Sequence, residues 1–475
     1  MSDLATIIRR PRPAPPPPAL LAGLRALAEL PVRPEGPPPN DPRRAIEAII
    51  AELDRIMGEM IERILHHPEF QALEATWRGV RLLLDGADGD PAVKIRLFDI
   101  SKRELARTLR KFRGTAWDQS PLFRRIYDEE YGQFGGQPFG VLVGDYAFDH
   151  SAPDVTLLSD IARIAAAAHV PFIAAAAPSL MQMDSWSELA NPRDISRLFR
   201  TPEYTAWRAL RQGEDTRYIG LCLPRFLARL PYGYRTEPVD AFAFEEEVDG
   251  PDDRNFLWAN PAYAMAGNIA RAFRLYGWCV RIRGIDGGGL VQGLPEYHFP
   301  TADGDADPRC SVEIALSERR ESELAANGLI PLVHLRNGDG TAFVGAPSLQ
   351  EPAVYDAPDA TANAVMSARL PYIFATCRFA HYLKCMVRDK IGTSMDGPAI
   401  ERWLQSWING YVDGSPQTSS EEHKASHPLA DASIKLEARQ DQPGTYEARF
   451  FIRPHYQLEA STATVRLLSK LAGTS

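Results

Sequence analysis

The alternation of hydrophobic and polar positions divides the chain into helical and strand-like segments. From Asp41, the run "DPRRAIEAIIAELDRIMGEMIERIL" repeats apolar residues at helical spacing, and Pro42 suits the first helical position. The apolar arc is broader than a lone surface helix needs, so the pattern predicts that this helix is buried against a partner. The positions expected to carry that contact are Ile46, Ile49, Leu53, Ile56 and Met60.

Helix and strand patterns alternate through the middle of the chain. A second helix runs through "FQALEATWRGVRLLLD", a strand is predicted at "AVKIRLFDI", and a capped helix begins at Ser101. Further strands are predicted at "FGVLVGDYAF", "VPFIAAAA", "TRYIGLCLPR" and "GWCVRIRG". Helices are predicted at "DVTLLSDIARIAAAAH" and "PAYAMAGNIARAFRLY". This order is typical of a mixed α/β layer architecture.

The C-terminal part reads as two helical stretches, a polar linker and a hairpin. The helical patterns are "ANAVMSARLPYIFATCRFAHYLKCMVRDKI" and "GPAIERWLQSWINGYV", and the linker covers residues 413–431. The strands "ASIKLEAR" and "TYEARFFIRP" flank the turn "QDQPG". Alternation places Ile434 and Leu436 of the first strand, and Phe450 and Ile452 of the second, on one face that we expect to be buried.

The N-terminal residues have a composition of their own. Two proline-rich runs, "RRPRPAPPPPA" and "PVRPEGPPPNDP", are expected to be extended linkers. Between them, Ala19–Leu30 predicts a short amphipathic helix whose apolar stripe is Leu20, Leu21, Leu24 and Leu27. Such a helix either docks on the body of its own chain or serves as bait for a partner's groove.

These patterns predict a multi-domain protein. We expect a flexible proline-rich arm at 1–43, a partner-binding helical segment at 44–115, a central α/β domain at 116–365, and C-terminal helices with the hairpin at 366–475. A chain of 475 residues is long enough for two or three domains.

Composition narrows the classes of partner. The net charge of −9 provides no overall basic field for nucleic acid or an anionic membrane. The five cysteines are scattered and odd in number, which favours free thiols in a reducing cytoplasm. We expect neither a transmembrane helix nor a secretory signal, because the chain has no apolar run of sufficient length and no cleavage pattern at its start.

The glycine-rich run "GIDGGGLVQG" raises the question of a phosphate-binding loop. Its glycine spacing fails the dinucleotide pattern at Gln292, and no Gly-Lys-Ser/Thr sequence closes a nucleotide loop. Gly293 and Pro295 also break any helix that would point its amides at an anion. The spacing therefore indicates an irregular connection in a β-rich segment.

Other polar clusters offer weak candidates for chemistry. Asp145, Asp149 and His150 could hold a metal, but their spacing favours a role in a turn or at a helix start. The adjacent His66 and His67 would point apart on a helix, which favours a helix end.

The remaining candidates lack the partners that catalysis requires. Ser179 has no nucleophile elbow, the acidic run "EEEVDGPDD" favours a solvated loop, and Cys377 and Cys385 are too far apart for a disulfide. We therefore expect no enzyme, cofactor or metal site.

Several long motifs resemble one protein family. They are "LHHPEFQALEATWRGV", "WDQSPLFRRIYDEEYGQFGGQPFGVLVGDYAF", "AAAAHVPFIAAAAPSLMQMDSW", "RYIGLCLPRFLARLPYG", "GGGLVQGLP", "SARLPYIFATCRFAHYLK", "RDKIG" and "IRPHYQLE". In this order they resemble the large sheath subunit of the type VI secretion system, the TssC/VipB/EvpB family, from Ala45 to the C-terminus. The proline-rich arm and "GTSMDG" depart from that family's pattern.

The resemblance implies a structural subunit of a cytoplasmic contractile tube. It implies pairing with a small TssB/VipA-like subunit, polymerisation with neighbouring copies around an Hcp inner tube on a baseplate, and disassembly by a ClpV-like AAA+ unfoldase. It also implies strand exchange between subunits, which we expect at Ile434, Leu436, Phe450 and Ile452, and an unfoldase site that position alone would assign to Ala19–Leu30. Two alternatives stay open: a related phage-tail-like injection device, and an unrecognised α/β enzyme.

Overall fold

The computed structural model describes residues 42–131, 133, 135–191, 194–248, 255–297, 310–335, 340–390, 397–416, 418–438 and 446–455. The chain forms two compact units. The first comprises residues up to Phe70 together with Pro231–Asn255, and the second comprises Gln71–Leu230 and Phe256–Ser475.

The first unit is organised around helix α2 (Pro42–Leu65), which was predicted from Asp41 onward. Its C-terminal half contacts the segment 231–248 of the same unit. Gly58 lies against the Phe244 ring. The backbone N–H of Glu247 donates to Glu62, and His66 Nε2 lies 3.3 Å from Glu246 Oε1.

The second unit contains a six-stranded sheet in the order β1-β2-β3-β7-β8-β6. The first four strands in this order pair in parallel: β1 (Leu142–Phe148), β2 (Phe172–Ala176), β3 (Ile219–Leu223) and β7 (Leu329–His334). The short strands β8 (Thr341–Phe343) and β6 (Leu290–Val291) complete the sheet in antiparallel pairing. A separate two-stranded ribbon pairs β4 (Phe226–Leu227) with β5 (Trp258–Ala259).

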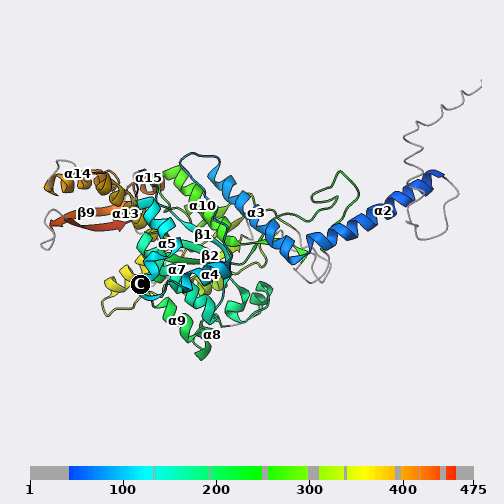
Figure 1. The fold of residues 1–475 in the computed structure, drawn as a ribbon, viewed down its shortest axis with the longest axis horizontal. Helices are drawn as coiled ribbons and strands as arrows, with labels where there is room; N and C mark the ends of the chain where they lie inside the picture. Colours follow the sequence, from blue (N-terminus) through cyan, green and yellow to red (C-terminus); the bar gives the residue numbers. More distant parts are fainter. Residues whose placement is uncertain are drawn as a thin grey trace, which may run out of the picture. The chain divides into compact units, whose positions relative to one another are not determined.

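Helices cover both faces of this sheet (Figure 1), which confirms the predicted α/β layers. Along β2, Phe172 and Ala174 belong to the core that contains α7 (Ala152–Ala168), whereas Ile173 belongs to the core that contains α10 (Pro261–Tyr276). Because strand residues alternate between faces, a strand buried on both sides reads as one continuous apolar run.

The remaining helices surround the sheet or lead to the C-terminus. They are α3 (Pro68–Ala87), α4 (Lys102–Arg110), α5 (Pro121–Phe123), α6 (Glu129–Tyr131), α8 (Ile195–Leu198), α9 (Thr205–Arg211), α11 (Glu318–Ala326), α12 (Pro358–Ser367), α13 (Leu370–Lys390), α14 (Gly397–Asn409) and α15 (Glu421–Ser426). The cap predicted at Ser101 is present at the start of α4, where Ser101 and Glu104 form a capping box.

A third core lies at the C-terminal end of the chain. Strands β9 (Leu429–Ala438) and β10 (Tyr446–Pro454) form the predicted antiparallel hairpin, with Phe450 opposite Ile434. Helix α14 packs along β9, as Figure 1 shows at the left of the view. Ile434 is buried there together with Leu404 and Ile408 of α14.

Two predicted strands are absent. Residues 92–100 and 277–283 contain no strand. In the second segment, Trp278, Val280 and Ile282 are buried at alternate positions, and Trp278 stacks on Phe379 with ring centroids 4.1 Å apart. The alternation therefore reflects packing on one side of an extended segment, which does not require a neighbouring strand.

The predicted polar linker at 413–431 is not a simple linker. It contains helix α15, whose N-terminus is capped by Ser420. Asp413 is buried, and its Oδ1 accepts the Ser415 N–H at 2.9 Å. Ala425 belongs to the same core as the hairpin. Local capping, and the burial of Ala425 and Leu429 in this core, accompany the folding of a segment whose composition is mainly polar.

Candidate assembly surfaces

The glycine-rich run forms a tight turn whose carbonyl oxygens accept hydrogen bonds from the side chains of Arg271 and Asn268. Residues Ile285–Gly289 make one turn, with Gly288 at φ 87°, before β6 begins. The Arg271 guanidinium donates to the Gly288 carbonyl at 2.9 Å, and the Asn268 amide donates to the Gly289 carbonyl at 2.9 Å. A phosphate cradle presents N–H groups, so these contacts have the opposite polarity and support the predicted structural connection.

Asp149, which directly follows β1, serves the start of α7, as predicted, whereas Asp145 lies within β1. Asp149 Oδ1 accepts the Ser151 N–H at 2.8 Å, and Asp149 Oδ2 accepts the Ser179 hydroxyl at 3.2 Å. These contacts, with burial opposing them, hold the pKa of Asp149 below its ordinary value. Asp145 instead accepts from Thr76 and Asn260, while the His150 ring stacks on Tyr204. The three residues therefore face different partners.

His66 lies at the end of α2, as predicted. The first residues of the acidic run "EEEVDGPDD", however, do not form the expected solvated loop. His66 follows the last residue of α2, and its ring lies between Glu62 and Glu246 at 3.2 and 3.3 Å. Glu246 is buried, and it also accepts the Tyr232 N–H at 2.9 Å. The sequence pattern missed this role because it counted charges without the partners that the fold supplies.

Titratable side chains in the core have pKa values displaced by burial. Burial lowers the pKa of His381 to about 3 and that of His169 to about 4, with nearby cations as a secondary cause. Burial also raises the pKa of the Cys377 thiol, so that it stays protonated. No disulfide joins Cys377 and Cys385, as expected.

These groups do not assemble a reactive centre. Within the described ranges, no group of three or more His, Cys, Asp or Glu side chains is arranged to hold a metal ion. Over the same residues, no helix is both long and apolar enough to span a membrane.

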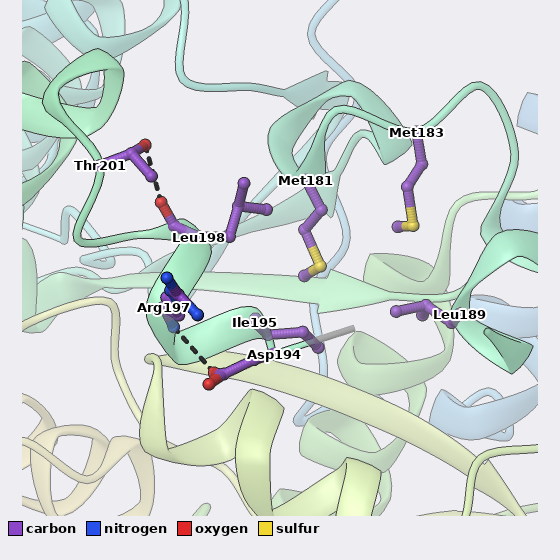
Figure 2. A pocket seen from close by; sticks show the side chains of 8 residues that line it. All are labelled: Met181, Met183, Leu189, Asp194, Ile195, Arg197, Leu198 and Thr201. Carbon is purple, nitrogen blue, oxygen red and sulfur yellow. Dashed lines mark hydrogen bonds between the residues drawn. The ribbon is translucent and has the colours of Figure 1, made fainter. Parts of the chain in front are cut away.

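One cavity of about 460 Å³ lies between the turns that follow β2 and helix α8. Figure 2 shows the side chains of Met181, Met183, Leu189 and Ile195 converging on it. Its rim carries the charged residues Asp194 and Arg197. Sequence reasoning missed this cavity, because its lining comes from short turns with no regular apolar period.

Helix α2 exposes an apolar stripe. Of the five predicted contact residues, Met60 is 61% exposed, and the other four are half-buried. Three further residues that the prediction did not include, Ile50, Met57 and Ile64, are also exposed. With Ile46, Leu53 and Met60 they form a 4-3-4-3-4 spacing, which is the seam pattern of a coiled coil.

Helix α3 also carries an unburied apolar strip. Leu73, Trp77 and Leu84 lie within a narrow arc of the helix, and Trp77 is 58% exposed. The roughly opposite side of the helix is buried, with Gly79 against Tyr263 and Gly86 against the Gly267 backbone. The apolar surface of α3 is thus wider than its contact with its own chain.

The hairpin's apolar face is covered unevenly. Ile434 is buried, Leu436 and Ile452 are half-buried, and Phe450 is exposed. The adjacent Phe451 is 55% exposed on the opposite face. Burial is therefore greatest where β9 meets α14 and least along β10.

The two outer edges of the hairpin also differ. Along β9, the Ile434 N–H donates to Gln405 Oε1 at 2.8 Å, and Gln405 Nε2 donates to the Ala432 carbonyl at 3.0 Å. The Leu436 N–H donates to Glu401 Oε2 at 2.8 Å. Side chains of α14 thus take the place of a neighbouring strand and close this edge.

Among the residues that the structure describes, nothing pairs with the edge of β10 around Phe450. Because the Ile434 N–H points to α14, the Ile434–Phe450 pair is not hydrogen-bonded between the strands, so the Phe450 N–H and C=O point outward. Near the end of this edge, the Tyr372 hydroxyl donates to the Ile452 carbonyl at 3.4 Å. No backbone partner for Phe450 occurs in the part of the chain that the structure describes.

The predicted unfoldase-binding residues Leu20, Leu21, Leu24 and Leu27 lie outside the described residues. The features on the described residues are an α/β body, exposed apolar helical faces and a hairpin with one open edge. These features define a structural protein that is completed by assembly with other chains.

Comparison with known proteins identifies the kind of assembly. Residues 47–350 match a family model described as the EvpB/VC_A0108 tail sheath N-terminal domain, and residues 359–471 match its tail sheath gpW/gp25-like domain. The type VI secretion system sheath protein TssC1 of Pseudomonas aeruginosa is 58% identical over 453 residues, covering 95% of this chain and 91% of the relative.

Two solved structures show weaker likeness. A chain in the anti-feeding prophage baseplate is 12% identical with a TM-score of 0.39, covering 79% of this chain and 83% of the other. A chain in the contracted sheath complex of the extracellular contractile injection system PVC is 12% identical with a TM-score of 0.33, covering 64% and 66%.

The protein is a contractile-sheath subunit. It belongs to the VipB/EvpB tail sheath family of the type VI secretion system. The resemblance drawn from the sequence motifs is confirmed.

Proposed function

We propose that this chain pairs with a small TssB/VipA-like subunit, and that the pairs polymerise around an Hcp inner tube from a baseplate. Contraction of this polymer expels the tube, and a ClpV-like AAA+ unfoldase dismantles the contracted form. In this role the chain is cytoplasmic and has no catalytic activity, no nucleic-acid partner and no membrane-inserted segment. The observation that carries the proposal is the open edge of β10 beside the closed edge of β9.

The asymmetry of the hairpin supports strand exchange through one edge. An incoming strand that paired with β9 would have to displace the side chains of Gln405 and Glu401 from three backbone bonds. A strand that paired with β10 at Phe450 would break no hydrogen bond from a described side chain there. Main-chain pairing of this kind depends little on side-chain identity and persists while the bodies of the subunits rotate. We therefore assign inter-subunit pairing to β10.

Hydrogen exchange read by mass spectrometry tests this assignment. The chain would be co-expressed with its small subunit and compared before and after assembly into filaments. We expect peptides covering β10 to gain protection on assembly, because their outward N–H groups acquire partners. Peptides from β9 serve as the internal control, since α14 already binds their outward groups. Equal exchange at β10 in both states would contradict the pairing.

A matched pair of substitutions separates backbone from side chain. Phe450→Pro removes an N–H that points away from β9, so the hairpin itself loses no bond. Phe450→Ala removes the ring and keeps the N–H. We expect the proline variant, and not the alanine variant, to abolish filaments in negative-stain microscopy. Normal filaments from both variants would show that this edge does not join subunits.

Pairing with the small subunit is assigned to the segment 44–115. The seam of α2 exposes Ile50, Met57, Met60 and Ile64 in the chain alone. Exposed apolar stripes of this length indicate a partner, and burial of each large side chain stabilises a complex by about 2 kcal/mol. We expect the chain to aggregate when expressed alone and to become soluble with the small subunit. A well-behaved monomer by light scattering, with no partner present, would argue against this contact.

The other domain assignments remain proposals. Residues 1–43 form the arm that the unfoldase engages, 116–365 the central body, and 366–475 the joining region. The sequence also left open a related phage-tail-like injection device, but the family match and the 58% identity to TssC1 favour the type VI system.

A further inference from the structure

An exposed apolar loop separates the two regions that match the sheath family models. It follows Gln350 and precedes α12, and within it Val354 is 86% exposed and Tyr355 is 55% exposed. Among the described residues, little covers Val354, and Tyr355 is only about half covered. We call residues 352–357 the knob loop.

The knob loop is held in place at both ends. The Glu351 N–H donates to the Arg211 carbonyl at 2.8 Å, which fixes the loop to the end of α9. The Thr361 hydroxyl of α12 accepts the Tyr355 N–H and donates to the Tyr355 carbonyl, both at 2.9 Å. Because both backbone groups of Tyr355 are bound, its side chain is presented from an ordered backbone, which lowers the entropy lost on binding.

The cavity beside α8 has the chemistry to receive such a side chain. Its volume of about 460 Å³ is within the range of small-molecule and side-chain pockets. The walls are apolar, and two of them are methionine side chains, Met181 and Met183, whose thioethers adapt to the shape of an occupant (Figure 2). Arg197 of α8 and Asp194 just before it line the pocket and are exposed.

The charges around the two features are complementary. Asp356 and Asp359 flank the knob, are exposed, and form no ion pair among the described residues. Arg197 at the pocket rim and Arg200 just after α8 are also exposed and equally without an ion-pair partner there. The acidic Asp194 on the same rim is committed to its helix, since Oδ1 accepts the Arg197 N–H at 2.8 Å.

We propose that the knob loop of one subunit docks in the α8 cavity of a second copy of this chain. Tyr355 would enter the cavity, and Asp356 and Asp359 would meet Arg197 and Arg200. The loop does not fill the cavity of its own chain, because Val354 and Tyr355 are exposed. A knob and a pocket at different places on one molecule make a head-to-tail contact, which propagates into a helical polymer. The inference rests on the sheath function, which requires such a polymer.

Engineered cysteines test the contact directly. The full chain carrying Tyr355→Cys and Leu198→Cys would be co-expressed with the small subunit, assembled, oxidised and analysed by denaturing electrophoresis without reductant. We expect a ladder of covalent oligomers from filaments and none from unassembled protein. The control pairs Leu198→Cys with Leu275→Cys, a residue of similar exposure on α10. Filaments without a ladder, or an equal ladder from the control, would overturn the contact.

Charge reversal in the chain that carries Tyr355→Cys and Leu198→Cys tests the contact independently. Asp356→Arg with Asp359→Arg should lower the crosslinked fraction about tenfold, because like charges would then face each other. Arg197→Asp with Arg200→Asp should do the same, and all four changes together should restore the ladder. Failure to restore it would refute the proposed pairing of charges. If the unmodified chain and its partner form no filaments, the sheath role itself falls, and this contact with it.

Discussion

Gly289 offers a sharp test of why the glycine-rich run exists. A Cβ atom placed on Gly289 would lie 2.3 Å from the Phe343 carbonyl oxygen and 2.7 Å from both the Arg283 Cα and the Gly284 nitrogen. Carbon and oxygen normally approach no closer than about 3.3 Å. All three neighbours are backbone atoms, so rotation of a side chain cannot relieve the contact. Alanine at this position requires the turn and β8 to move apart by roughly 1 Å.

That movement disrupts bonds that hold the turn to the sheet. The Gly289 N–H donates to the Gly284 carbonyl at 2.8 Å, and the Gly284 N–H donates to the Phe343 carbonyl at 2.8 Å. Overpacking costs about 1 to 3 kcal/mol, and each hydrogen bond lost adds about 1 kcal/mol. Gly289→Ala should therefore destabilise the protein by about 3 to 5 kcal/mol, a large part of the roughly 5 to 15 kcal/mol that typical domains possess.

Gly287→Ala is the matched control. It lies in the same turn, but a Cβ atom there meets no atom within 4 Å, and its φ lies outside the left-handed region. Its effect should stay within about 0.5 kcal/mol. Urea unfolding of each variant, purified with the small subunit and followed by tryptophan fluorescence, makes the comparison. Equal midpoints for the two variants would refute the close-approach explanation and would reopen a binding role for the run.

Three further predictions concern the edge, the core and the arm. Gln405→Leu should leave the Ala432 carbonyl and the Ile434 N–H of β9 unbound, and hydrogen exchange in 429–438 should become about tenfold faster. Unchanged exchange would count against the role of Gln405 in closing this edge. Burial, and then the Lys384 ammonium, lowers the pKa of His169 from 6.5 to about 4 in the folded state. The folded state thus binds fewer protons, so its stability is fully present above pH 6.5 and falls by up to about 3 kcal/mol as pH drops toward 4. His169→Asn, which tolerates the left-handed backbone there, should flatten this part of the profile in urea titrations, and an unaltered profile would exclude His169 as its source. Leu24→Asp with Leu27→Asp, outside the described residues, should weaken unfoldase binding by several kcal/mol, at about 2 kcal/mol per leucine before the charge penalty, and leave sheath assembly intact. Undiminished recovery of the unfoldase in a pull-down would reject the site.

The sequence predicted helices and strands most accurately where the local residue pattern and the packing of the fold favour the same element. The buried strands β2 and β3 and the helices α7 and α10 appear where their apolar runs and caps indicated. The segments 92–100 and 277–283 failed because alternation records which side of the backbone is covered, and both extended loops and strands can satisfy it. Whether a strand forms depends on a neighbour that the local pattern does not contain.

The candidate surfaces were only partly accessible to sequence reasoning. The apolar arc of α2 was recognised, but the exposed residues Ile50, Met57 and Ile64 were not among the five residues predicted to make the contact. Counting the 4-3-4-3-4 spacing would have added them to that prediction, since this spacing marks a narrow seam rather than a broad face. The cavity beside α8 had no such signal, because Met181, Leu189 and Leu198 meet only through the fold.

The hairpin shows that the sequence alone does not reveal which strand edge is available for pairing with another chain. In the sequence, β9 and β10 are equivalent strands with apolar residues on one face, and both outer edges look available. The fold breaks this equivalence through Gln405, whose amide carries a donor and an acceptor spaced like those of a peptide group and binds both Ala432 and Ile434. One edge is thereby used within the subunit, and we propose that the other pairs with a neighbouring subunit. A subunit with one available edge adds one strand at that hairpin, so the contact has a fixed polarity. Fixed polarity prevents hairpins from pairing indiscriminately at both edges, which is the aggregation risk that open strands carry.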